Sequence, residues 1–465
     1  MNHKRMAEST NDLFGKKHLK EFLLQLFHRL EQANVKYCVL RNYQMIPEGI
    51  ENDVDMLVLP KDRLAFERCI LDSAKATGWS LLMKPVRYGY RSYWFQSTTS
   101  GRYVHFDAWT KIAWKGLRWA NEAKILSRRI RRKQFYIPCA SDEACISLIK
   151  DLIQLGNIKE KYKNLITSML RQDKMSLIKA LGWGLGKSLS TKLCDLIEEG
   201  KWSEIAIRKD EIRKRVFIEC VRRKPISPII GMACFFGGYI WSLISHRSGI
   251  FIAFIGPDGS GKTTIANMLL HSMRDIFPST QCYHGRFGIL PDMRTLYNKL
   301  RMWFGYRPLP EAGAGTAALH DMTPHGVFRA LAYLGYYAID YILGFWHVNQ
   351  SRAKGQMIVF DRYYYDYYVS PLFAKIPRFL LSAVGWIIPK PDMLLYLNCD
   401  ADAIHQRKPE LTPAQIRYQQ QEIERYLSNL DYYYMINSEG NLAESVNNIE
   451  RLIVSALQKR NYKGK

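Results

Sequence analysis

A run of glycines, a lysine and threonines in the second half of the chain has the composition of a phosphate-binding loop. The run is GPDGSGKTT, residues 256–264, which follows the apolar segment FIAFI and precedes IANMLL. Glycines at this spacing let backbone N–H groups turn toward phosphates, with a helix N-terminus behind them. Lys262 would reach the β- and γ-phosphates of ATP, and the Thr263 hydroxyl would bind Mg²⁺. We therefore predict that the loop binds ATP through Gly256, Gly259, Ser260, Gly261, Lys262, Thr263 and Thr264.

Charged residues elsewhere in this half fit the transfer of a phosphoryl group. Asp258 lies inside the loop, where a carboxylate beside phosphate is costly unless it contacts an acceptor hydroxyl. Asp361 and Arg362 end an apolar stretch, so Asp361 would act on magnesium and its water, or as the base toward the acceptor. Arg362 would hold an acceptor phosphate or the transferring group. Arg407 and Lys408 would stabilise charge during transfer, unless they form only an exposed basic helix end.

These motifs resemble those of thymidylate kinases. The DGSGKTT loop, the Asp361-Arg362 pair and the basic helix are similar to the loop, the DR motif and the lid over ATP in that family. A long insert at 283–356 departs from ordinary thymidylate kinases. Its segments YHGRFGILP, TPH and YYAIDYILG resemble thymidylate kinase-like proteins that many bacteria encode near surface-polysaccharide genes. The resemblance implies an ATP- and Mg²⁺-dependent kinase with a nucleotide or sugar-type acceptor. Arg286 and His325 are candidate acceptor contacts, with a structural role as the alternative for each.

Three acidic residues in the N-terminal part form a second candidate site. Asp53 and Asp55 alternate in the expected strand DVDMLVL, so both carboxylates point to one side, and Asp107 follows in a later hairpin. Such a set could hold two Mg²⁺ ions for in-line nucleotidyl transfer. It resembles the nucleotidyltransferase superfamily, although Arg41 and Asn42 occupy the region where that family has Gly-Ser for the triphosphate. Three interpretations stay open: an active transferase in which Arg41 holds phosphate, a binding or degenerate domain, and a coincidence of acidic residues.

The elements expected around these residues differ between the two halves of the chain. Before the loop, an amphipathic helix at 19–32 precedes strands at 35–41 and 53–59 and a hairpin at 90–109, and helices are expected from 141 to about 220. After it, strands and helices alternate, which predicts a parallel sheet covered on both faces. The fold class is therefore α/β, with an α+β nucleotidyltransferase-like domain at 1–138, a helical domain at 139–224, an apolar and basic linker at 225–248, and a thymidylate kinase-like P-loop domain at 249–465.

Charge and hydropathy indicate the kinds of partner. The formal net charge is +24, and such a field attracts nucleic acid, anionic lipid headgroups or phosphorylated substrates. The uncharged segment 226–245 has basic residues on both sides. It could span a bilayer, lie on a cytoplasmic membrane face or form a buried helix, and we favour the second. The N-terminus lacks the apolar core of a signal peptide, and the nine cysteines show no CxxC pair, so we expect a cytoplasmic or peripheral inner-membrane protein.

Two classes of function remain after these observations. The leading hypothesis is a bacterial ATP-dependent phosphotransferase that acts on a small-molecule or glycan acceptor and carries a nucleotidyltransferase-like module, with surface-polysaccharide biosynthesis as its setting. The alternative is a nucleic-acid-associated protein that binds ATP and uses its basic surface. This alternative is less favoured because the sequence lacks a recognisable helix-turn-helix, zinc finger or RNA-binding aromatic signature.

Overall fold

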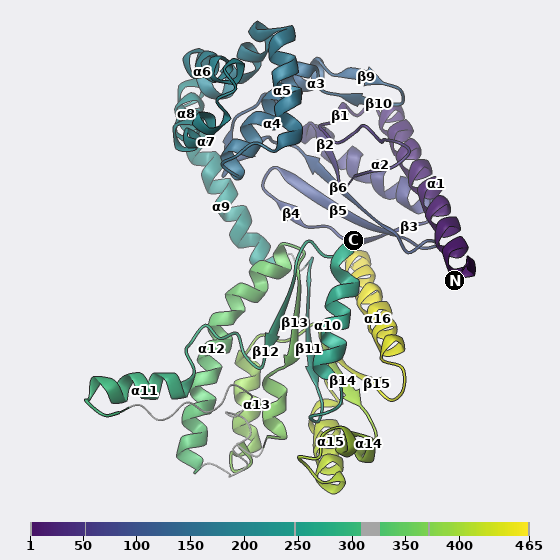
Figure 1. Ribbon diagram of the computed structural model, residues 1–465, viewed down its shortest axis with the longest axis vertical. Coiled ribbons are helices and arrows are strands. Elements are labelled where there is room, and N and C mark those ends of the chain that lie inside the picture. Colours follow the sequence, from purple (N-terminus) through teal and green to yellow (C-terminus); the bar gives the residue numbers. More distant parts are fainter. Residues whose placement is uncertain (1, 52, 246–247, 308–325, 371–372, 464–465) are drawn as a thin grey trace. The chain divides into compact units, whose positions relative to one another are not determined.

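A computed structural model describes residues 2–51, 53–245, 248–307, 326–370 and 373–463. It divides into two compact units, Met1–Ser242 and Leu243–Gly464 (Figure 1). The division falls inside the segment that the sequence suggests as a linker, 225–248. The finer division into four domains stays a prediction.

The first unit contains a mixed sheet of six strands in the order β1-β2-β6-β5-β3, with β4 paired to β5. β2 and β6 run parallel and place Asp55 opposite Asp107. β5 and β6 form the predicted antiparallel hairpin. The strands are β1 (Tyr37–Val39), β2 (Val54–Val58), β3 (Trp79–Met83), β4 (Val86–Arg87), β5 (Tyr90–Ser97) and β6 (Tyr103–Trp109).

Two helices cover one part of this sheet. They are α1 (Asn2–Gln32) and α2 (Arg63–Ala76), which pack against each other, and the short 3₁₀ turn η1 (Pro60–Asp62) leads into α2. Phe22 of α1 stacks on Trp79 with ring centroids 5.6 Å apart and meets Phe106 edge-on at 5.3 Å. Buried aromatic pairs of this kind contribute beyond their buried area, so they fix the helix on the sheet.

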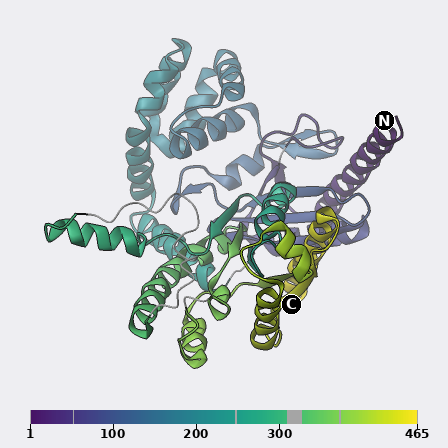
Figure 2. The same cartoon turned by 60° about the horizontal axis from the view of Figure 1, so that its bottom comes forward.

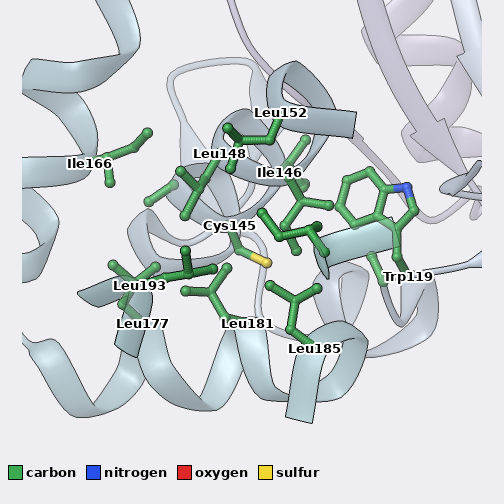
Figure 3. Packing of buried hydrophobic residues seen from close by; sticks show 14 of the residues in the cluster. Trp119, Cys145, Ile146, Leu148, Leu152, Ile166, Leu177, Leu181, Leu185 and Leu193 are labelled. Atoms are coloured by element: carbon green, nitrogen blue, oxygen red, sulfur yellow. The ribbon is translucent and has the colours of Figure 1, made fainter. Parts of the chain in front are cut away.

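A second buried cluster joins the sheet to the helices that follow it. Figure 3 shows Cys145, Leu148 and Leu152 of α4 meeting Leu177 and Leu181 of α6. Cys38, Leu40 and Leu57, from the sheet region, belong to the same cluster. The helices therefore share a core with the strands. The helices are α4 (Ala140–Gln154), α5 (Glu160–Gln172), α6 (Lys174–Glu198), α7 (Trp202–Ile207) and α8 (Lys209–Arg223). In the sequence, five short elements connect the sheet to these helices: β7 (Ala113–Trp114), β8 (Leu117–Arg118), α3 (Glu122–Ser127), β9 (Ile130–Arg132) and β10 (Phe135–Ile137).

The apolar segment forms one helix, α9 (Ser227–Ser245). It packs on the first unit at Gly231, where an added Cβ would lie 2.3 Å from the Gly116 carbonyl oxygen, so only glycine permits this approach. Large apolar side chains on its other side are exposed. Among the described residues, no single helix is long and apolar enough to cross a membrane. In this part of the chain, one pair of helices, α8 and Ser227–Leu243, is together long and apolar enough to cross a membrane, judged by length and composition alone. The two helices are bent by 119° relative to each other.

The second unit is built on a five-stranded sheet in the order β12-β13-β11-β14-β15, in which every neighbouring pair is parallel. The parallel sheet confirms the α/β prediction for this part of the chain. All six residues of β11 are buried, as expected for a central strand covered on both faces. The strands are β11 (Ile250–Ile255), β12 (Thr280–His284), β13 (Met357–Arg362), β14 (Met393–Asn398) and β15 (Tyr433–Asn437).

Helices flank this sheet in two groups (Figures 1 and 2). α10 (Lys262–Ser272) and α16 (Leu442–Lys463) pack against each other, while α12 (Val327–Ala353) contacts β11, β13 and α13 (Arg378–Ile387). The other elements are η2 (Met273–Asp275), α11 (Met293–Trp303), η3 (Tyr364–Tyr368), α14 (Ala401–Arg407) and α15 (Pro413–Leu427). Because parallel strands end at one edge, the loops after β11, β12, β13 and β14 meet there.

Candidate functional site

The loop between β11 and α10 has the backbone conformation that its glycines permit. Gly261 precedes α10 with a φ of 92° and Gly259 has a φ of 93°. A Cβ on Gly259 would also lie 3.3 Å from Cγ2 of Ile404 and from Cβ of Lys408. Left-handed conformations are costly for other residues, so the glycines are required to turn the loop around the helix N-terminus. This arrangement presents backbone N–H groups of the kind that bind phosphate.

Lys262 is held inside this loop. Its side chain is buried, and Nζ donates hydrogen bonds to the carbonyl oxygens of Gly256, at 2.6 Å, and Pro257, at 2.9 Å. Burial lowers the pKa of Lys262, while the carboxylates of Asp366 and Asp258 act in the opposite direction. A bound polyphosphate would supply the negative charge that this buried ammonium group requires.

Two features of the loop fit a phosphate ligand. The Ser260 hydroxyl oxygen is buried and has no hydrogen-bond partner among the described residues. A buried hydroxyl without a partner is costly, and a phosphate oxygen would satisfy it. Beside the loop lies a cavity of about 530 Å³, within the size range of small-molecule sites. It is lined by Asp258, Gly259, Gly261, Lys262, Thr263, Thr264, Arg362, Arg407, Lys408, Gly440 and Leu442.

Oxygen ligands suited to Mg²⁺ lie where the loop meets the end of β13. The Thr263 hydroxyl donates to Asp361 Oδ2 at 3.0 Å, although the two residues are far apart in sequence. A hydroxyl and a carboxylate at this separation fit the oxygen chemistry of Mg²⁺, which takes few protein ligands besides phosphate. His284 Nδ1 lies 2.7 Å from Asp361 Oδ1 and orients the same carboxylate. The sequence interpretation missed His284, which can be found as the last residue of β12 at the same sheet edge.

Asp258 is surrounded by positive charge. Arg362 pairs with its Oδ1, Lys262 Nζ lies 3.5 Å from Oδ1, and Lys408 Nζ lies 3.7 Å from Oδ2. Burial alone would raise the pKa of Asp258, but these three cations lower it to about 2. Asp258 is therefore ionised near neutral pH and holds the loop, Arg362 and the end of α14 together. Arg407, the last residue of α14, lines the cavity beside it.

Asp366 was not predicted as a site residue. One of its carboxylate oxygens, Oδ1, is buried and accepts no hydrogen bond from the described residues. Burial raises the pKa of Asp366 to about 7, despite the opposing attraction of Lys262 and Arg362. The sequence signal was available, because VFDRYYYD ends in this aspartate, but only the turn of η3 brings it close to the loop. The neighbouring Tyr363 is a core residue whose hydroxyl donates to the Pro389 carbonyl oxygen at 2.6 Å.

The insert segments pack against one another next to this site. Asp340 of α12 is fully buried and accepts hydrogen bonds from the backbone of Leu290, at 2.8 Å, and Gly288, at 3.1 Å. Gly344 leaves room for the Phe287 ring, since an added Cβ would lie 2.0 Å from it. The motifs YHGRFGILP and YYAIDYILG are thus two sides of one contact.

The two predicted acceptor contacts have different outcomes. Arg286 pairs with Asp292, donates to the Leu290 carbonyl oxygen at 3.1 Å and lies over the Tyr337 ring at 5.3 Å. These contacts give it a role in holding the insert loop. His325 lies outside the described residues. An acceptor role for either residue stays a prediction.

In the first unit, the structure brings the three predicted acids together. Ligand oxygens of Asp53, Asp55 and Asp107 all lie within 4.8 Å of one another. Burial raises the pKa of Asp53, and the neighbouring Asp55 and Asp107 raise it further. His105 Nε2 lies 2.9 Å from Asp107 Oδ1, and Ser92 donates to the same oxygen. The oxygens of Asp53 and the second oxygen of Asp107 could still hold a divalent cation.

Asp55 already has partners for both of its oxygens. Arg41 Nε donates to Oδ2 at 2.6 Å, and the Trp109 indole N–H donates to Oδ1 at 2.8 Å. Lys150 Nζ, from α4, lies 3.8 Å from Oδ2. Burial would raise the pKa of Asp55, but Lys150 and Arg41 hold it below its usual value. Arg41 is therefore committed to Asp55 in this structure, and two protein cations offset charge that metal ions would otherwise balance.

Comparisons with known proteins add little to this geometry. No protein-family model matches the chain, and no curated protein sequence matches it. Among solved structures, the chain is similar to thymidylate kinase from Ehrlichia chaffeensis, with 16% identity over 44% of this chain and 98% of that one and a TM-score of 0.29. With this TM-score the similarity decides neither family nor activity.

Proposed function

We propose that the second unit is an ATP-dependent kinase. The Thr263–Asp361 hydrogen bond carries the proposal, because it joins the phosphate-binding loop to the end of β13 in the arrangement that a Mg²⁺–nucleotide requires. Lys262 provides a buried cation for the phosphates. Ser260 provides a buried hydroxyl that has no hydrogen-bond partner among the described residues. Thr263 and Asp361 would hold Mg²⁺, which would offset the negative charge of the phosphates.

Residues around the cavity supply the remaining charge stabilisation. Arg407 and Lys408 line it at the end of α14, where they can close on the phosphates. The side chain of Asp400 starts this helix by accepting the N–H groups of Asp402 and Ala403, both at 3.0 Å. That N-cap fixes the helix that carries Arg407.

Binding of MgATP is the first test. MgATP at about 100 times its Kd should stabilise a competent site by about 2.7 kcal/mol, which raises the melting temperature of the purified protein by a few degrees. Lys262→Met should remove this increase, because it deletes the buried ammonium group. Lys375→Met, which changes an exposed lysine of the same unit, should keep it. A wild-type melting curve that MgATP leaves unchanged would sink the proposal.

For the first unit we propose a nucleotide-binding module with a transferase ancestry. The three carboxylates support a metal–nucleotide site, while the pairing of Asp55 with Arg41 and Lys150 favours binding over rapid transfer. A protein with both modules fits the synthesis of activated glycans, in which phosphorylation and nucleotide transfer alternate. We therefore propose bacterial surface-polysaccharide biosynthesis as the setting.

We also propose a cytoplasmic location with peripheral contact to an anionic membrane. Ile229 and Trp241 of α9 are 70% and 63% exposed, and exposed Arg222 and Lys224 lie just before the helix. An apolar face next to cations suits the interface of an anionic bilayer. Nucleic-acid binding through the +24 charge is the less favoured alternative, and a duplex-DNA titration in rising salt tests it.

A further inference from the structure

Among the described residues, four carboxyl groups that are at least half-buried mark what we take as the acceptor side of the kinase site, and three of them have clear partners or roles. Asp258 is ion-paired with Arg362 and near Lys262 and Lys408. Asp361 accepts from Thr263 and contacts His284. Asp340 accepts two backbone N–H groups. Only Asp366 has an oxygen that is buried and accepts no hydrogen bond from any described residue.

Asp366 lies within electrostatic reach of two residues of the kinase site. Its strongest attractions are to Lys262 and Arg362, which both line the cavity. The residue as a whole is half-buried, while its oxygen without a partner, Oδ1, is covered. An unsatisfied buried carboxylate oxygen is costly, and a hydroxyl hydrogen would satisfy it. The charged and titratable groups that interact with Asp366 are Lys262, Arg362, Asp258, Asp361, Tyr341 and Tyr367.

The cations on this side do not favour a phosphate as acceptor. Arg362 pairs with Asp258, and Arg286 pairs with Asp292. An acceptor that carries its own phosphate would have to break these pairs and face the carboxylate of Asp366. A neutral hydroxyl would need no free cation, and it would donate its hydrogen to the oxygen that lacks a partner.

We propose that the acceptor of this kinase is a neutral alcohol, as on a sugar or polyol, and that Asp366 accepts the proton of the attacking hydroxyl. This inference rests on the proposed kinase function and narrows its substrate class. The hydroxyl oxygen bonds to the γ-phosphorus of ATP, the bridging bond between the β- and γ-phosphates breaks, and ADP leaves with the electron pair. The hydroxyl proton passes to the Asp366 carboxylate. Nucleoside monophosphates, whose acceptor is already an anionic oxygen, need no such base.

Water is the smallest neutral hydroxyl, so ATP hydrolysis without added acceptor tests the inference directly. We expect wild-type protein to hydrolyse MgATP, and we expect Asp366→Asn to lower kcat by about 100-fold, in the range of general-base catalysis. Asp431→Asn, which changes an exposed aspartate of the same unit, should leave kcat unchanged. Wild-type protein that binds MgATP without hydrolysing it would overturn the inference, as would an Asp366→Asn variant with the wild-type rate.

The pH profile separates a proton acceptor from a residue that only supports the fold. Burial raises the pKa of Asp366 to about 7, so the active, ionised form should accumulate as the pH rises through 7. Hydrolysis by wild-type protein should rise over that interval, and the residual rate of Asp366→Asn should not. If MgATP still stabilises the Asp366→Asn variant, its nucleotide site is folded. If that stabilisation is lost, Asp366 has a structural role, which would count against the inference.

Acceptor choice supplies the second measurement. Wild-type protein should transfer phosphate from labelled ATP to hexoses and polyols, and the Asp366→Asn variant should lose most of this transfer. Neither protein should transfer phosphate to thymidine monophosphate. Transfer to thymidine monophosphate that survives in Asp366→Asn would contradict the inference and leave the kinase proposal intact. Failure of wild-type protein to gain stability with MgATP would instead refute the kinase proposal itself.

Discussion

Two lysines, Lys262, which is buried, and Lys150, which is half-buried, set the electrostatics of the two candidate sites. Burial lowers the pKa of both Lys262 and Lys150, and each has carboxylates near it that act in the opposite direction. Lys262 faces a cavity that can admit phosphate. Lys150 instead lies 3.8 Å from Asp55 and 4.7 Å above the Trp109 ring, inside the acidic cluster. The first lysine would therefore favour an anionic ligand, and the second would compete with a metal ion for the same carboxylate.

Replacing Lys150 should strengthen metal binding at the acidic cluster. Lys150→Gln removes a positive charge next to Asp55, so the affinity of the first unit for Mn²⁺ should increase by roughly ten-fold, equal to about 1.4 kcal/mol. Titration of Mn²⁺ followed by electron paramagnetic resonance measures this change. Lys187→Gln, which changes an exposed lysine on α6, is the matched control. Equal or weaker Mn²⁺ binding by Lys150→Gln than by the control would disprove the competition.

The candidate residues that the sequence suggests are those whose chemistry is local. Lys262 and Thr263 belong to one short loop, and Asp361 and Arg362 follow directly from an apolar strand. Asp366, His284 and Lys150 were missed because their roles depend on which elements meet. Lys150 lies on a helix whose sequence is typical of a core helix, and it reaches Asp55 only because α4 packs near β2. Periodicity in a single sequence carries no such information.

Among the elements, α12 and the loop after β12 determine the shape of the acceptor side. Asp340 holds the loop backbone, and the Tyr341 hydroxyl donates to the Gly285 carbonyl oxygen. Phe287 lies against α12 at Gly344 and meets the Phe360 ring with centroids 4.9 Å apart. The loop is thus fixed by buried polar and aromatic contacts from one helix.

Two glycines of α12 should respond to alanine with opposite signs. Gly344→Ala should destabilise the second unit by about 1–3 kcal/mol, because its Cβ would overlap the Phe287 ring. Gly335→Ala on the same helix has no atom within 4 Å of the new Cβ, so it should stabilise the helix by about 0.5–1 kcal/mol. Urea unfolding measures both changes. A stabilising or neutral Gly344→Ala would show that the Phe287 contact is not formed in solution.

At the level of elements, the central strands were predictable and the outer ones were not. β11, β13 and β14 are continuous apolar runs, as strands buried on both faces must be. β12 and β15 lie at the edges of the sheet, and their sequences, TQCYH and YYMIN, lack that signal. In the first unit, β1 spans only Tyr37–Val39 of the strand predicted at 35–41, and α1 begins well before the predicted residue 19. Element ends depend on tertiary pairing and are poorly encoded locally.

For the molecule as a whole, the two units contain one proposed site each. The first contains an acidic cluster with two cations next to it, and the second contains a phosphate loop with an adjacent cavity. The net charge of +24 adds a long-range attraction for polyanions. In the sequence, the division between the units falls within α9, which carries large exposed apolar side chains such as Ile229. The position of α9 makes it the element that we expect at a membrane surface.

Vesicle binding tests this expectation. Wild-type protein should co-sediment with vesicles that contain phosphatidylglycerol and bind less as salt rises, because the attraction of the basic flanks is screened. Replacing both Ile229 and Trp241 by Gln should weaken binding at least ten-fold, since each buried apolar side chain contributes about 1.5–3 kcal/mol. Ile207→Gln, at a residue that is 82% exposed on α7, is the control for loss of an apolar surface residue away from α9. Equal binding by the double variant and this control would remove α9 from the membrane and leave the basic surface to other polyanions. Sedimentation of wild-type protein with neutral vesicles alone would instead disprove the attraction to anionic lipid.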